Sequence, residues 1–85
     1  MEIFDNVKYI LFELCGIENI YLEQELQGDL ALNSLQMITL IIMLEEKFQI
    51  TLDESDMNPF ALVNVQDVID LVTKYKKQAE VEQDG

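Results

Sequence analysis

The feature that most limits how this chain can fold is an apolar helix predicted for residues 34–48, which carries two apolar stripes. At about 100° per residue, one side of this helix collects a core stripe typical of a buried face. The core stripe consists of Met37, Leu40, Ile41, Leu44 and Phe48. A flank stripe of Leu35, Ile38 and Ile42 runs beside it. Periodicity leaves two interpretations of the flank stripe open: it packs on another helix of the domain, or it docks a partner.

Polar residues mark the beginning of this helix. Asn33 is a favoured N-cap, and Gln36 three residues later can complete a capping box. Ser34 therefore falls in the first turn, where free N–H groups and the positive end of the helix dipole favour an attached anion. A serine here is usually only part of a cap. A phosphate ester on Ser34 would nevertheless be well placed electrostatically.

Three short runs of residues resemble the acyl carrier proteins and their peptidyl carrier relatives. The runs are Asp29-Leu30, Asn33-Ser34-Leu35 and Leu44-Glu45-Glu46-Lys47-Phe48. In that family an Asp-Ser-Leu motif opens the second helix, and Leu-Glu-Glu-x-Phe follows about ten residues later. The resemblance covers roughly residues 2–78, nearly the whole chain. It implies a carrier domain that bears 4′-phosphopantetheine on a serine, which in this sequence is Ser34.

The resemblance also implies a mechanism and a set of partners. The thiol of the arm would hold an acyl or aminoacyl group as a thioester, and the chain would be a carrier and not an enzyme. The family's docking contacts map onto the flank stripe, with an acidic rim formed by Asp29, Glu45 and Glu46. The implied partners are a phosphopantetheinyl transferase and the acyl- or aminoacyl-loading and condensing enzymes, which would present basic docking surfaces.

The sequence departs from the family pattern at three points. The usual aspartate before the serine is Asn33, which keeps the cap but removes a charge that the transferase often reads. The small residue two positions earlier, commonly glycine, is Ala31. Acidic residues that fatty-acid carriers place early in the helix are replaced by Gln36 and Thr39. This last difference favours a discrete carrier of a specialised pathway, such as polyketide or nonribosomal peptide biosynthesis, and leaves acyl and aminoacyl cargo both open.

Charge and composition exclude several classes of function for this chain. Seventeen acidic and five basic residues give a net charge of −12, which repels nucleic acid and anionic membranes and attracts basic protein surfaces. Without histidine, a histidine-activated serine nucleophile and most zinc sites are excluded. The single Cys15 permits no internal disulfide and is interpreted as a small core residue. The competing class is an unmodified acidic helical module that binds basic partners.

The predicted fold is all-α, a small four-helix bundle of three longer helices and one short helix, with a long first loop. The longer helices are expected at residues 2–15, 34–48 and after Asn64, where Asp67 completes a second capping box. The short helix is expected after Asp53. In the long loop, a helical turn is predicted over residues 21–26.

The expected carrier domain spans residues 1–79, and residues 80–85 form a polar, frayed tail. Lys74, Lys76 and Lys77 are expected near the C-terminus of the last helix, where its dipole favours cations. The N-terminus has no basic region or cleavage site, and no run is long enough to span a bilayer. A cytoplasmic monomer is therefore expected.

Overall fold

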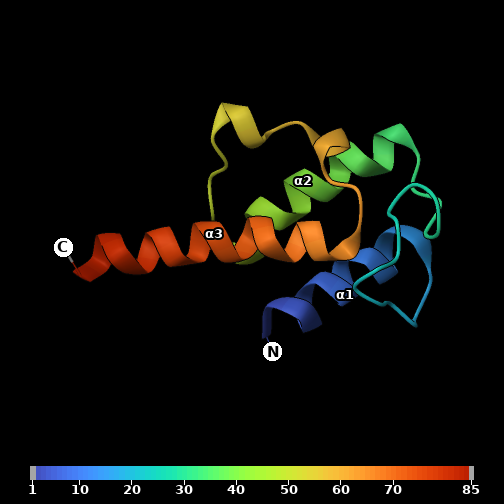
Figure 1. Cartoon of the computed structure of the whole chain (residues 1–85), viewed down its shortest axis with the longest axis horizontal. Coiled ribbons are helices and arrows are strands. Elements are labelled where there is room, and N and C mark those ends of the chain that lie inside the picture. The colour runs from blue at the N-terminus through green and yellow to red at the C-terminus, as the bar shows by residue number, and fades with distance from the viewer. Residues whose placement is uncertain (1, 85) are drawn as a thin grey trace.

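The computed structural model describes residues 2–84 and the side chains of residues 3–78. Residues 2–84 form three α-helices and two 3₁₀ helices, in the order α1 (Glu2–Cys15), α2 (Ser34–Phe48), η1 (Glu54–Asp56), η2 (Pro59–Ala61) and α3 (Val65–Asp84). Helix α1 packs against α2 and α3, and η2 packs against α2. Figure 1 shows α3 passing in front of the other two helices, with the long first loop gathered at one end. The prediction of an all-α fold is confirmed.

The predicted short helix is present only as the two single turns η1 and η2. Pro59 has no N–H to donate and disfavours helical dihedrals in the residue before it. The Asn58 side chain accepts a hydrogen bond from the Phe60 N–H at 3.1 Å and so caps η2 locally. These two residues divide the segment, which explains why a continuous fourth α-helix does not form.

Helix α1 ends at Cys15, as predicted. Gly16 adopts a left-handed conformation with φ of 75°, and its N–H donates to the carbonyl of Phe12 at 2.7 Å, which is a common way to end a helix. Cys15 is free and partly buried against the core, in agreement with its interpretation as a core residue.

The turn predicted over residues 21–26 is present only as a single hydrogen-bonded turn, in which the Gln24 N–H donates to Tyr21 O at 3.2 Å. The long loop is held by its apolar residues. Its buried residues are Ile20, Leu26, Leu30 and Leu32. Instead of forming a helix, Glu25 pairs with Asn64 in an isolated antiparallel bridge. The N–H of Leu26 donates to Val63 O at 2.9 Å, and the N–H of Val65 donates to Gln24 O at 3.0 Å. Backbone groups that a helix would satisfy locally are therefore satisfied by the segment that leads into α3.

Helix α3 begins with the predicted capping box. Asn64 Oδ1 accepts from the Asp67 N–H at 3.0 Å, and Asp67 Oδ2 accepts from the Asn64 N–H at 3.3 Å. Its apolar face is buried at Val65, Val68, Ile69, Val72 and Tyr75. Ala79 continues this spacing in the sequence, and we expect it on the same face, but it lies outside the residues whose side chains are described.

The prediction that the lysines lie at the end of the last helix is wrong. Helix α3 continues to Asp84, so Lys74, Lys76 and Lys77 lie in its middle. Lys74 forms an ion pair of 2.9 Å with Asp56. The Nζ of Lys76 donates to Phe48 O at 3.1 Å, so this cation stabilises the C-terminal end of α2 instead.

Candidate functional site

Helix α2 displays Ser34 at its first position. The residue before it, Asn33, is extended, with φ of −83° and ψ of 177°. Asn33 Oδ1 accepts from the Gln36 N–H at 2.8 Å, and Gln36 Oε1 accepts from the Asn33 N–H at 2.9 Å. This predicted capping box fixes the backbone on both sides of Ser34, whose side chain is exposed.

The electrostatic surroundings of Ser34 suit an attached phosphate. The first turn of α2 consists of the uncharged residues Ser34, Leu35, Gln36 and Met37. No acidic side chain of this turn therefore opposes a phosphodiester, and the positive end of the helix dipole favours it. An accessible hydroxyl next to an anion-favouring helix end fits a serine-linked phosphopantetheine.

The flank stripe is exposed to solvent. The exposed fractions of Leu35, Ile38 and Ile42 are 72%, 47% and 48%. The core stripe of the same helix is buried, as predicted. This exposure excludes the interpretation that the flank stripe is buried against another helix of the described chain. Ser34 and three apolar side chains therefore share the outer face of α2, a combination that suits the docking of a partner.

Two residues of the predicted acidic rim, Glu45 and Glu46, are neighbours near the end of α2, and the third, Asp29, lies in the loop before this helix. Asp29 is exposed in the loop before α2, where its Oδ2 accepts from the Glu25 N–H at 2.8 Å. Glu45 is half-buried, and its Oε2 accepts from the Leu52 N–H at 2.9 Å. Glu46 is exposed. With a rise of about 1.5 Å per residue, Glu45 lies roughly 16 Å along the helix from Ser34. Because the Glu45 carboxylate accepts from Leu52, it also holds the connection that follows α2.

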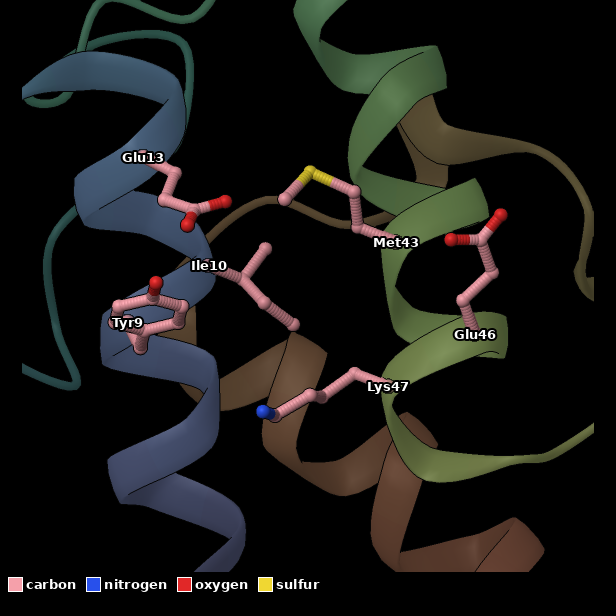
Figure 2. Close-up of a pocket in the computed structure, with 6 residues that line it drawn as sticks. All are labelled: Tyr9, Ile10, Glu13, Met43, Glu46 and Lys47. Atoms are coloured by element: carbon pink, nitrogen blue, oxygen red, sulfur yellow. The ribbon is translucent and has the colours of Figure 1, made fainter.

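A hollow of about 220 Å³ between α1 and α2 includes Glu46 in its lining. Figure 2 shows Ile10 and Met43 pointing toward each other across it, with the side chain of Lys47 extending toward Tyr9. The neighbouring Glu13 carboxylate raises the pKa of the Tyr9 phenol, mainly through a hydrogen bond. Met43 is nine residues after Ser34, about half a turn around the helix. The hollow therefore opens on the side of α2 opposite the serine.

The sequence analysis missed a second group of exposed apolar residues next to α2. Met57, Phe60 and Val63 flank or belong to η2 and are 41%, 47% and 55% exposed. Since η2 packs against α2, the segment that carries these residues lies beside the helix with the flank stripe (Figure 1). The segment is too short to show a periodic stripe, so its only sequence signal is a set of apolar residues around Pro59.

Neither a metal-binding cluster nor a membrane-spanning helix is found in the part of the chain that the structure describes. Within residues 3–78, no group of three or more His, Cys, Asp or Glu side chains could hold a metal ion. Likewise, no helix of the described chain is both long and apolar enough to cross a membrane.

The fold and the site define a helical carrier domain with a serine available for a prosthetic group. Residues 7–72 match the family described as "Phosphopantetheine attachment site". The chain is also 34% identical to the acyl carrier protein of Campylobacter jejuni (strain RM1221) over 79 residues, which span 91% of this chain and 100% of the relative. The acyl carrier proteins of Campylobacter lari (strain RM2100) and Campylobacter concisus (strain 13826) are 32% and 30% identical over the same shares.

The chain therefore belongs to the acyl carrier protein family, whose domains carry covalently attached 4′-phosphopantetheine. Members of this family are carriers and are not themselves catalytic. The family resemblance given by the three sequence runs is confirmed.

Proposed function

We propose that this chain holds an acyl or aminoacyl group as a thioester on 4′-phosphopantetheine attached to Ser34, and presents it to partner enzymes. The observation that carries the proposal is the exposure of Ser34 at the first position of a capped helix, beside the exposed flank stripe. The arm would come from coenzyme A. Ser34 Oγ forms the new P–O bond, the adenosine bisphosphate leaves, and a base of the transferase takes the hydroxyl proton.

Partner enzymes would dock on the flank stripe, with Leu35, Ile38 and Ile42 as the apolar contacts. Asp29 and Glu46 are exposed acids that would attract basic groups at the edge, while Glu45 would contribute charge from a half-buried position. Attraction between charged surfaces speeds encounter, and a small apolar contact keeps the complex short-lived. Both properties suit a carrier that visits several enzymes in turn, beginning with the phosphopantetheinyl transferase.

The cargo would belong to polyketide, nonribosomal peptide or related specialised biosynthesis. This part of the proposal is supported by the uncharged Gln36 and Thr39 early in α2, where fatty-acid carriers place acids. Mass spectrometry of the thioester released from carrier isolated from its own cells would test it. An ordinary fatty-acyl intermediate as the main cargo would contradict this part alone.

Attachment to Ser34 is tested by Ser34→Ala in a reaction with a phosphopantetheinyl transferase and coenzyme A. Intact-mass spectrometry should show the wild type gaining one phosphopantetheine and the variant gaining none. Ser55→Ala is the matched control, because Ser55 is an exposed serine in η1, and this variant should be labelled like the wild type. Labelling of Ser34→Ala would place the arm elsewhere. A wild-type protein that is never labelled would instead indicate an unmodified acidic interaction module.

A further inference from the structure

The side-chain amide of Gln36 connects two helices through its two ends. Its Oε1 accepts from the Asn33 N–H at 2.9 Å and closes the capping box of α2. Its Nε2 donates to the carbonyl of Leu14 at 2.7 Å in a partly buried bond across 22 residues of sequence. Leu14 lies in the last turn of α1, where carbonyls lack partners within the helix. One side chain thus completes the beginning of α2 and anchors it to the end of α1.

This anchor matters because the first turn of α2 has little burial of its own. Ser34 and Leu35 are exposed, Gln36 is half-buried, and Met37 is the first fully buried residue of the helix. Helix ends with few buried contacts open more easily than the rest of a protein. The order of the turn that carries Ser34 therefore depends on the capping box and on the bond to Leu14.

We propose that Gln36 is a positioning residue that holds Ser34 in the orientation that the phosphopantetheinyl transferase binds. This inference depends on the proposed attachment at Ser34. Gln36 acts through its bond to Leu14 O, which fastens the first turn of α2 to the end of α1. If the anchor is lost, the serine occupies its binding-competent position for a smaller fraction of the time, and the apparent KM for the carrier rises by the inverse of that fraction. The kcat changes little, because the docked serine has the same geometry.

Three substitutions separate the two functions of the amide. Gln36→Glu keeps an acceptor for the Asn33 N–H but cannot donate to Leu14 O. Gln36→Lys keeps a donor for Leu14 O but cannot accept from Asn33. Gln36→Met has a similar length and provides neither bond.

The test measures kcat and KM for the transfer of phosphopantetheine to each carrier variant at about 0.5 M salt, where the Debye length is only a few ångströms. Loss of the bond to Leu14 O predicts a KM increase of up to about fivefold for Gln36→Met, with kcat within about twofold. Gln36→Glu should resemble Gln36→Met, whereas Gln36→Lys should recover most of the wild-type KM. Thr39→Glu and Thr39→Lys are the charge controls, since the Thr39 hydroxyl bonds only within α2, to Leu35 O at 2.9 Å.

Amide hydrogen exchange gives a readout that does not depend on the transferase. The N–H groups of the first turn of α2 should exchange faster in Gln36→Met and Gln36→Glu, with exchange in the middle of α3 unchanged. A Gln36→Met carrier that is folded and has the wild-type KM would overturn the inference. If Ser34→Ala is still labelled, the arm is attached at another residue, and the proposed attachment to Ser34 is overturned instead.

Discussion

The conformation around Ser34 depends on single residues whose chemistry differs from the family pattern. Asn33 accepts from the Gln36 N–H as an aspartate would, at 2.8 Å, but it is neutral. The cap is therefore retained while a negative charge next to the serine is absent. If the transferase docks on the flank stripe as proposed, we expect its recognition of this carrier to depend more on the apolar residues Leu35 and Ile38 than on charge at this position.

Ala31 provides a residue-scale prediction about stability. Its φ is 57°, in the left-handed region that non-glycine residues adopt at a cost of roughly 1–2 kcal/mol. Ala31→Gly removes this cost but adds freedom to the unfolded chain. The free energy of unfolding should increase by about 0.5–1 kcal/mol, which corresponds to a melting temperature roughly 2–8 °C higher for a domain of this size. Thermal denaturation followed by circular dichroism measures this change.

Gln27→Gly is the matched control for Ala31→Gly. Gln27 is exposed in the same loop but is not among the residues with positive φ. Glycine there gives no relief of strain and only increases the entropy of the unfolded chain, so the melting temperature should fall. If both glycine variants lower it equally, Ala31 is not strained.

At the scale of elements, the two stripes of α2 separate docking from folding. Ile38 is 47% exposed on the flank stripe, whereas Ile41 is 2% exposed and packs with Leu52 and Tyr75. Ile38→Asp should change the free energy of unfolding by less than about 1 kcal/mol and weaken binding to the transferase. Ile41→Asp, the same change three residues later, should cost more than about 4 kcal/mol, because it buries a carboxylate without a partner. Urea denaturation and a binding titration measure the two effects.

The connection between η1 and α3 should make stability depend on pH. Asp56 Oδ2 accepts from the Tyr75 hydroxyl at 2.5 Å and from Lys74 Nζ at 2.9 Å. These bonds, that of Tyr75 first, lower the pKa of Asp56 below its ordinary 3.8. A carboxylate with a lowered folded-state pKa stabilises fully above its unfolded-state pKa, and this contribution is lost as the pH falls through the folded-state value. The acid-induced decrease in urea midpoint below about pH 4 should therefore be smaller in Asp56→Asn.

Tyr75 should make the stability contributed by the same connection decrease at alkaline pH. Burial, followed by the hydrogen bond to Asp56, raises the pKa of its phenol above the ordinary 10.0. The protonated phenol is thus favoured in the folded state, and its contribution is lost only as the pH rises through the raised pKa. Tyr75→Phe should remove this alkaline dependence and part of the acid dependence. Parallel pH profiles for Tyr75→Phe and wild type would show that the connection contributes nothing.

At the scale of the whole molecule, local patterns predicted the helices but not the contacts between distant segments. The bounds of α1 and α2, the capping boxes at Asn33 and Asn64, and the buried stripe of α2 follow from residues within a turn or two of each other. The bridge between Glu25 and Asn64 and the bond from Lys76 to Phe48 O join residues far apart in sequence. No periodicity or spacing encodes such partners, so the bridge that follows the turn at Tyr21 was not predicted. The lysines were misplaced for a different reason, because α3 continues to Asp84.

In the candidate site, too, local patterns predicted some features and contacts between distant segments determined the others. Ser34 and the flank stripe follow from the motif and from helical periodicity. The bond from Gln36 to Leu14 O could not be predicted, because it requires the end of α1 to lie beside the beginning of α2. The half-buried position of Glu45 depends in the same way on the course of the chain after α2, where the N–H of Leu52 reaches its carboxylate.

The net charge of −12 predicts two opposite effects of salt on one molecule. The five basic residues are already counted in this net charge, so most of the acidic side chains have no opposite charge to balance them and repel one another in the folded state. Raising NaCl from about 0.05 to 0.5 M shortens the Debye length and should raise the melting temperature. The same change should slow association with a basic transferase surface, because attraction is screened too. Thermal denaturation measures the first effect, and stopped-flow association rates measure the second. An association rate with the transferase that rises with salt would show that the charge does not guide docking.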